Sequence, residues 1–163
     1  MSTESSFTRR GWIARTMGML VGGGMLTALR PVVTSAAEKP VTITIYKDPS
    51  CGCCTKWVTH LQANGFATHV QDRPDMDALK DSLGVPSALR SCHTAVAGRY
   101  VIEGHVPAHD VVRLLSSAPA DVVGLAAPGM PVGAPGMEMG ARADRYDVIA
   151  FSANGATHVF THH

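Results

Sequence analysis

Three of the four cysteines in this 163-residue chain occupy four consecutive positions, Cys51-Gly52-Cys53-Cys54. Cysteines this close together cannot join distant segments through disulfide bonds, so the cluster is expected to carry chemistry and not to cross-link the fold. The alternating β-branched run 41–46 predicts a strand that ends just before the cluster. Apolar residues within 57–61 recur at helical spacing and predict a helix that ends at Gly65. The sequence therefore predicts a cysteine cluster at the junction of a first strand and a first helix.

The chain continues with alternating strand and helix patterns. The predicted elements are a strand at 66–71, a helix from Asp75 to Gly84, a hairpin of 93–96 and 99–102, and a last helix that begins at Pro107 with Val111, Val112, Leu114 and Leu115 on its core face. This β-α-β-α-β-β-α order resembles the thioredoxin fold, in which a redox or metal pair lies at the first strand–helix junction. We therefore expect one α/β domain, a thioredoxin-like mixed sheet with flanking helices.

The C-terminal part adds a methionine-rich segment and a hairpin. From Gly124 to Gly140 the chain is rich in Gly, Pro, Ala and Met and has no periodicity, which predicts a long irregular loop. Loops of this length in a compact domain are usually functional or disordered. Residues 147–151 and 157–161 then alternate around Asn154-Gly155, a pattern typical of a β-hairpin.

The first 37 residues have the pattern of a cleaved export signal. The pair Arg9-Arg10 precedes an uncharged, glycine-rich stretch at 17–29, and small residues up to Ala37 offer a cleavage site. The arginine pair favours the twin-arginine route. The thirteen uncharged residues fall short of the roughly 20 needed to span a bilayer, so no stable membrane anchor is expected. The mature domain would then comprise residues 38–163 and lie in the periplasm.

Size and charge narrow the possible partners of this mature domain. Its 126 residues are enough for one hydrophobic core. It carries ten bases and twelve acids, a net charge of about −2, without a basic stripe. Nucleic acid is therefore not expected as a partner.

The cysteine cluster supports two kinds of chemistry. A helix start exposes N–H groups and a positive dipole end, which favour thiolate over thiol, as both soft-metal binding and disulfide exchange require. Cys51 and Cys54 alone form a CxxC pair that a thiol-disulfide oxidoreductase could use. Cys53 adds a third sulfur, which suits Cu(I) or a multi-copper thiolate cluster better. Thioethers also select Cu(I), and Met130, Met137 and Met139 supply them on the predicted loop.

Three more residues are candidate ligands through the expected fold. Cys92 falls where the first hairpin strand would face the cysteine cluster, and its alternative role is that of a small buried apolar residue. His105 ends the second hairpin strand and borders the same surface. His163 is either a frayed terminal residue or a ligand that reaches the site. His93 follows Cys92 on a strand, so its side chain is expected to point the other way. For the loop methionines, the alternative is a lid that packs on apolar surface.

The motifs together resemble a known family. They are Lys47-Asp48-Pro49-Ser50-Cys51-Gly52-Cys53-Cys54, Gly84-Val85-Pro86, Ser91-Cys92-His93-Thr94, Glu103-Gly104-His105-Val106-Pro107, and the Met130-Pro131 and Pro135-Gly136-Met137-Glu138 segments. With these motifs the chain resembles the thioredoxin-like periplasmic copper proteins often labelled CopG. The similarity covers essentially all of the mature chain. The resemblance implies bacterial copper resistance and a cluster of several copper ions that changes oxidation state, bound by Cys51, Cys53, Cys54 and Cys92.

Three functions follow as hypotheses. The first is a periplasmic copper-binding redox or storage protein in copper resistance, more a copper protein than a turnover enzyme. The second is a thiol-disulfide oxidoreductase that uses Cys51 and Cys54. The third is a chaperone that passes copper to other periplasmic copper proteins, with the methionine loop as the transfer arm.

Overall fold

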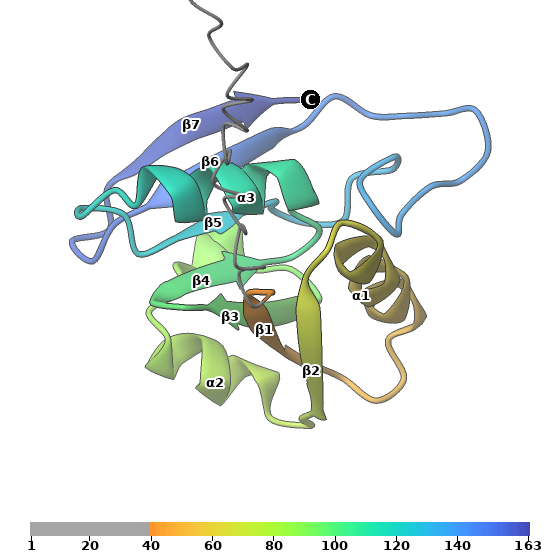
Figure 1. Ribbon diagram of the computed structural model, residues 1–163, viewed down its shortest axis with the longest axis horizontal. Helices are drawn as coiled ribbons and strands as arrows, with labels where there is room; N and C mark the ends of the chain where they lie inside the picture. Colours follow the sequence, from red (N-terminus) through yellow and green to blue (C-terminus); the bar gives the residue numbers. More distant parts are fainter. Residues whose placement is uncertain (1–39) are drawn as a thin grey trace, which may run out of the picture. The chain divides into compact units, whose positions relative to one another are not determined.

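The computed structural model describes residues 40–163, which form an α/β unit (Figure 1). The elements are β1 Thr42–Lys47, α1 Gly52–Ala63, β2 Ala67–Asp72, α2 Met76–Ser82, the short 3-10 helix η1 Ser87–Leu89, β3 His93–Ala97, β4 Tyr100–Glu103, α3 Ala108–Ser117, β5 Gly124–Ala126, β6 Asp147–Phe151 and β7 Thr157–His162. The predicted export signal at 1–37 lies outside these described residues. No helix between residues 40 and 163 is both long and apolar enough to cross a bilayer.

A single seven-stranded mixed sheet organises the unit, in the order β2-β1-β3-β4-β5-β6-β7. β1 pairs parallel with β2 and antiparallel with β3, and β3 and β4 form the predicted hairpin. β5 joins β4 in parallel, and the predicted C-terminal hairpin β6–β7 then extends the sheet. The α/β class and the mixed sheet expected from the sequence are therefore confirmed.

Strand alternation gives the sheet two apolar faces. On one face, Trp57 of α1 and Val111 of α3 pack with strand residues such as Ile45 and Ile102 in the larger core. The other face carries a smaller cluster that includes Leu89 and Phe151. Successive strand residues point to opposite faces, so β4 contributes to both clusters.

Two details differ from the sequence prediction. The predicted irregular loop begins with a strand, β5, whose three residues are all buried. A strand of three residues with both faces covered has no alternating pattern to detect. On α3, Val112 is 48% exposed and so is not a core residue, because it lies about 100° around the helix from Val111.

Candidate metal centre

A tight turn between β1 and α1 positions the cysteine cluster. The Asp48 carboxylate accepts a hydrogen bond from the Ser50 backbone N–H (2.8 Å), and the Asp48 carbonyl accepts one from the Cys51 N–H (3.0 Å). Cys51 has extended backbone angles and is the N-cap of α1. The next two cysteines therefore fall in the first turn of the helix, where Cys54 is fully buried and Cys53 is partly exposed.

The four sulfur atoms are in two chemical states. Cys51 and Cys54 are joined by a disulfide bond, whereas Cys53 and Cys92 are free. Each sulfur lies within 4.8 Å of the other three. The fold thus gathers all four predicted cysteine ligands into one group, with two of them in the oxidised form.

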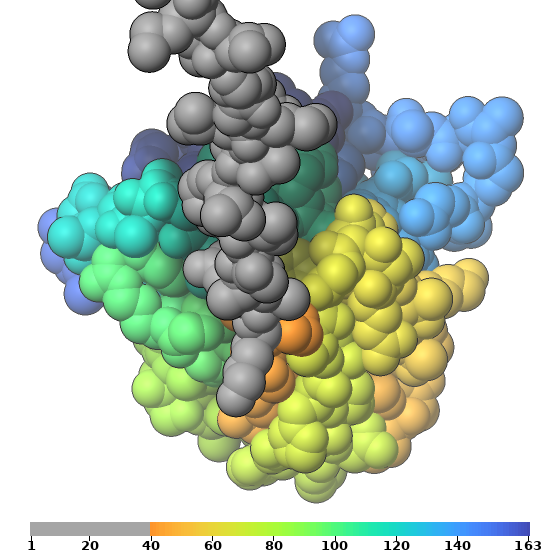
Figure 2. Space-filling model, viewed as in Figure 1, coloured from red at the N-terminus to blue at the C-terminus, as the bar shows by residue number. Residues whose placement is uncertain are grey.

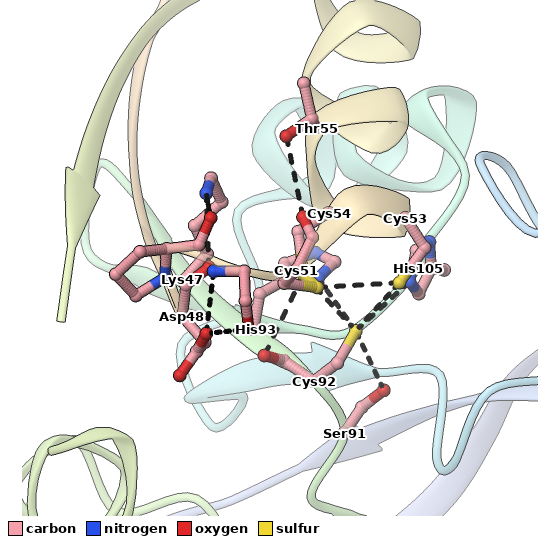
Figure 3. Close-up of a disulfide and its surroundings, with 12 residues drawn as sticks. Lys47, Asp48, Cys51, Cys53, Cys54, Thr55, Ser91, Cys92, His93 and His105 are labelled. Atoms are coloured by element: carbon pink, nitrogen blue, oxygen red, sulfur yellow. Dashed lines mark hydrogen bonds between the residues drawn. A yellow bond between two sulfur atoms is a disulfide. The ribbon is translucent and has the colours of Figure 1, made fainter. Parts of the chain in front are cut away.

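The Cys92 sulfur is at the centre of this group (Figure 3). It lies 3.6 Å from the Cys54 sulfur and 4.0 Å from the Cys53 sulfur, and the Cys53 sulfur in turn lies 3.5 Å from that of Cys51. His105 also approaches Cys92, with its Nε2 atom 3.2 Å from the sulfur. The Cys92 sulfur therefore contacts both the CxCC segment and an imidazole.

A buried carboxylate holds the segment that carries Cys92. Glu103 of β4 accepts hydrogen bonds from the Ser91 backbone N–H (2.6 Å) and the Thr94 hydroxyl (2.6 Å). Lys80 of α2 lies 2.5 Å from the same carboxylate and donates to the Thr94 hydroxyl (2.8 Å). Both ionic side chains are almost completely buried. Glu103 therefore holds the backbone just before Cys92 and the Thr94 side chain two residues after it.

His105 has the hydrogen-bonding pattern of a metal ligand. Its Nδ1 atom lies 2.7 Å from the Pro135 carbonyl, which can only accept, so Nδ1 carries the proton. Burial lowers the pKa of His105, against the opposing effect of this hydrogen bond, and favours the neutral ring. The neutral ring then presents the Nε2 lone pair to the Cys92 sulfur. A second hydrogen bond that orients the ring in this way is typical of ligating histidines.

The Cys92 thiol holds its proton tightly. Burial raises the pKa of Cys92 to about 12, and the nearby Cys53 adds to the shift. Cys92 is therefore a thiol at neutral pH, unlike the activated thiolates expected at the helix start. A metal cation that replaces this proton would stabilise the negative charge of the partly buried thiolate.

His93 was expected to point away from Cys92, but the two side chains are in contact. Its Nδ1 atom lies 3.3 Å from the Cys92 sulfur, and its ring packs against Trp57 with centroids 4.4 Å apart. Burial lowers the pKa of His93 far below the usual range. Within residues 40–163 its Nε2 atom has no hydrogen-bond partner. Strand alternation did not reveal this contact because Cys92 precedes β3 and does not follow its pleat.

The methionine loop contacts the site through its backbone. The Ser91 hydroxyl donates to the Gly129 carbonyl, and Pro135 accepts from His105. Gly136 fits closely against the start of α1. A Cβ atom added to it would lie 2.8 Å from the backbone nitrogen of Trp57 and 3.0 Å from the carbonyl oxygen of Cys53. Figure 2 shows this loop in light blue beside α1 in yellow. The loop therefore lies along the cysteine cluster.

The predicted methionine ligands differ in exposure. Met130 is 56% exposed, and Met139 is 67% exposed. Met137, which directly follows Gly136, is partly buried. The structure thus brings the backbone of the loop to the cluster and leaves the Met130 thioether largely in solvent.

His163 belongs to a different group from the cysteines. Its Nε2 atom lies 2.8 Å from an Asp110 carboxylate oxygen, and together with His109 these residues form a separate set of potential ligands. His163 is also not frayed, because its backbone pairs with Tyr146 in both directions (2.9 and 3.1 Å). The structure therefore does not bring it into the sulfur site.

Sequence reasoning missed Lys80 and Glu103. A glutamate that ends the apolar strand Tyr100–Glu103 was the available clue, since a buried carboxylate needs a cationic or hydrogen-bonding partner. Its partner Lys80 gave no such clue, because lysine on a short amphipathic helix is normally exposed.

Comparison with known proteins places these features in a family. Residues 89–137, which include Cys92 and His105, match the family described as "Protein of unknown function, DUF411". A search of curated proteins found no match. Two solved structures of copper resistance protein CopG, forms 1 and 2, are similar to the chain with 47% and 46% sequence identity. Each comparison covers 76% of this chain and 98% of the CopG chain, with a TM-score of 0.73. The chain therefore belongs to the CopG family of copper resistance proteins.

Proposed function

We propose that this protein binds copper ions in the periplasm as part of copper resistance, through Cys51, Cys53, Cys54, Cys92 and His105. The observation that carries the proposal is the position of the Cys92 sulfur, which lies within 4.0 Å of two CxCC sulfurs and 3.2 Å from a histidine nitrogen. Four sulfurs and an imidazole are soft to borderline donors, a set that suits Cu(I).

The arrangement favours more than one copper ion. A thiolate has several lone pairs and can bridge two ions, and the Cys92 sulfur has several potential co-ligands close by, among them Cys54 and His105. We propose a multinuclear, redox-active cluster that holds Cu(I) and cycles with Cu(II), with Cys92 as a bridging ligand. Met130 and Met137 would add thioether donors from the loop that lies along the cluster.

The disulfide bond sets a condition for binding. Cys51 and Cys54 cannot both ligate copper as thiolates while they are bonded to each other. Two electrons and two protons, delivered by a thiol or phosphine reductant, convert the disulfide into two thiols. Full copper binding would therefore follow reduction of the site.

Anaerobic Cu(I) titration with X-ray absorption of the copper-loaded protein tests this function. The reduced protein should bind copper with sulfur as the main ligand, and copper should remain after gel filtration. Changing Cys51, Cys53 and Cys54 together to Ser should abolish this binding. The domain should stay folded, as circular dichroism will show, because only Cys54 of the three is fully buried. Unchanged stoichiometry in a folded triple variant would place the site elsewhere.

We also propose that the chain is exported to the periplasm by the twin-arginine route and cleaved after Ala37. Other periplasmic copper proteins would then be its exchange partners. The sequence pattern of residues 1–37 supports this proposal. Mass analysis of periplasmic material should find a mature N-terminus at or near Glu38. Normal export after Arg9 and Arg10 are changed to Lys would exclude the twin-arginine route.

A second function, thiol-disulfide exchange, is favoured by one observation. The Cys51–Cys54 pair is an intramolecular disulfide with one partly exposed and one buried cysteine, so a reduced partner could attack only the Cys51 side. Such exchange would oxidise the partner dithiol and reduce this disulfide. Catalysed reduction of a disulfide substrate by copper-free protein, together with failure to retain copper after reduction, would favour this function over the first.

A further inference from the structure

A second group of metal-binding side chains lies outside the cysteine cluster, where the start of α3 meets the end of β7. His109 and Asp110 come from the first turn of α3, and His163 follows β7. Their potential ligand atoms, two imidazole nitrogens and a carboxylate oxygen, all lie within 4.8 Å of one another. In Figure 1 the end of β7, beside the label C, lies above α3, and the hydrogen bonds of Thr161 and His163 with Asp110 show that this end of the chain contacts the start of α3.

Two of the three residues are held in place by their surroundings. The Asp110 side chain is completely buried. It accepts a hydrogen bond from the Thr161 hydroxyl (2.9 Å) and forms an ion pair with Arg113 (3.1 Å). The His163 ring stacks on Tyr146, with centroids 5.0 Å apart and planes 20° apart. The carboxylate and one imidazole are therefore positioned before any ligand arrives.

The third residue, His109, has no comparable structural role. Its side chain is 68% exposed, and its Nε2 atom lies 3.6 Å from Asp110, too far for a hydrogen bond. Its ring nevertheless faces the His163 ring edge to face, with centroids 5.4 Å apart. A rotation of this exposed side chain would bring its nitrogen to the carboxylate.

We propose that His109, Asp110 and His163 form a second metal site that binds a divalent cation of the Cu(II) class. Two imidazoles and a carboxylate are the donors that such ions prefer, and among the first-row divalent ions Cu(II) binds such sites most tightly. Two ligand atoms at about 2.1 Å from one ion are at most about 4.2 Å apart, so only a small closing movement of His109 is needed. The ion would replace the proton that His163 Nε2 shares with Asp110, which is released to solvent, and water at the exposed side would supply the remaining ligands.

This site does not depend on the proposed sulfur site. It contains no sulfur ligand, so it would take the oxidised ion, whereas the cysteines would take Cu(I). It also explains His163, which the sequence places among the metal ligands and the structure places beside Asp110. The protein would thus offer separate sites to the two oxidation states of one metal.

The test uses the full chain without a histidine tag, in a Cys53→Ser, Cys92→Ser background. The Cys51–Cys54 disulfide stays intact in this background, so no thiol remains to bind or reduce Cu(II). Cu(II) is titrated against a competing chelator, and the bound ion is examined by electron paramagnetic resonance. We expect one Cu(II) per chain, with a spectrum that shows coupling to imidazole nitrogen.

Three further variants assign the ligands. His109→Ala and His163→Gln should each weaken Cu(II) binding by about tenfold or more, the scale found even for residues that only support a ligand. Gln can still donate a hydrogen bond to Asp110, and His109 is exposed, so both variants should fold, as circular dichroism will show. His162→Ala is the matched control, because His162 is exposed and pairs with Asp147 instead. Unchanged Cu(II) affinity in folded His109→Ala and His163→Gln, or an equal loss in His162→Ala, would overturn the site.

Discussion

The sulfur of Cys92 lies 3.6 Å from the sulfur of Cys54, although 38 residues separate them in the chain. The pairing of β1 with β3 brings the start of α1 close to Cys92. The buried Glu103 carboxylate accepts a hydrogen bond from the Ser91 N–H and so holds the backbone next to Cys92 in place. The contact distinguishes a four-sulfur site from a three-sulfur site on one helix turn.

Cys92→Ser should therefore lower the amount of Cu(I) that the reduced protein binds. A serine hydroxyl is a poor ligand for Cu(I), and because it can still donate to His105 Nε2 it should cost less than the about 1–3 kcal/mol of an unpaired buried hydroxyl. The measurement is Cu(I) stoichiometry, corrected for the folded fraction by circular dichroism. Wild-type copper loading in the folded variant would remove Cys92 from the site.

Copper capacity should depend on the oxidation state of the Cys51–Cys54 pair. Thiol titration of unfolded protein should find two thiols before reduction and four after it. The reduced form should bind more Cu(I) than the oxidised form, because two more sulfurs become available as ligands. Equal Cu(I) loading of the two forms would show that the pair takes no part in binding.

Gly136→Ala should detach the methionine loop from the start of α1. Gly136 has a φ of +85°, and an added Cβ would lie 3.0 Å or less from the Trp57 nitrogen and the Cys53 carbonyl. Gly140→Ala is the control, since Gly140 also has a positive φ (+69°) but no atom within 4 Å of an added Cβ. Both variants incur the left-handed backbone cost of about 1–2 kcal/mol.

The difference between the two glycine variants isolates the contact with the helix. Gly136→Ala should lose more unfolding free energy in urea than Gly140→Ala, and it should also release copper faster to a chelator. If both variants release copper at the wild-type rate, the loop does not cover the cluster.

Lys80→Met should destabilise the protein strongly. It would leave the Glu103 carboxylate buried without its cationic partner, and breaking one half of a buried pair typically costs about 3–5 kcal/mol. Arg73→Met breaks the exposed Arg73–Asp75 pair and should change the free energy of unfolding little, because solvent screens an exposed ion pair. Urea denaturation of the two variants measures both values. Similar losses would mean that solvent or another group neutralises Glu103.

The sequence predicts this architecture best where local chemistry and periodicity agree. The CxCC segment, the strand before it and the hairpin at Asn154-Gly155 all carry patterns that short-range physics produces. β5 has no such pattern, because it is only three residues long and all three are buried between two other strands. The burial of Val112 was misjudged for a related reason, since only the neighbouring strands decide which part of an apolar helix surface is covered.

The candidate site was predictable in its residues and not in its contacts. Cysteine content and position in the fold pointed to Cys92 and His105, and the structure places them 3.2 Å apart. The contact of His93 with Cys92 depends on the backbone direction before β3, which no residue pattern encodes. The pairing of Lys80 with Glu103 joins a helix to a strand 23 residues away, so it becomes visible only in three dimensions.

The Glu103 carboxylate has a consequence for the kinetics of metal uptake. Because Glu103 holds the Ser91 backbone and the Thr94 side chain, the sulfur of Cys92 is in place before an ion arrives. The chain then loses little conformational freedom on binding, in contrast to small domains that fold only around their metal. Uptake should be limited by delivery of the ion and loss of the thiol proton, and not by a search of the chain for its ligands.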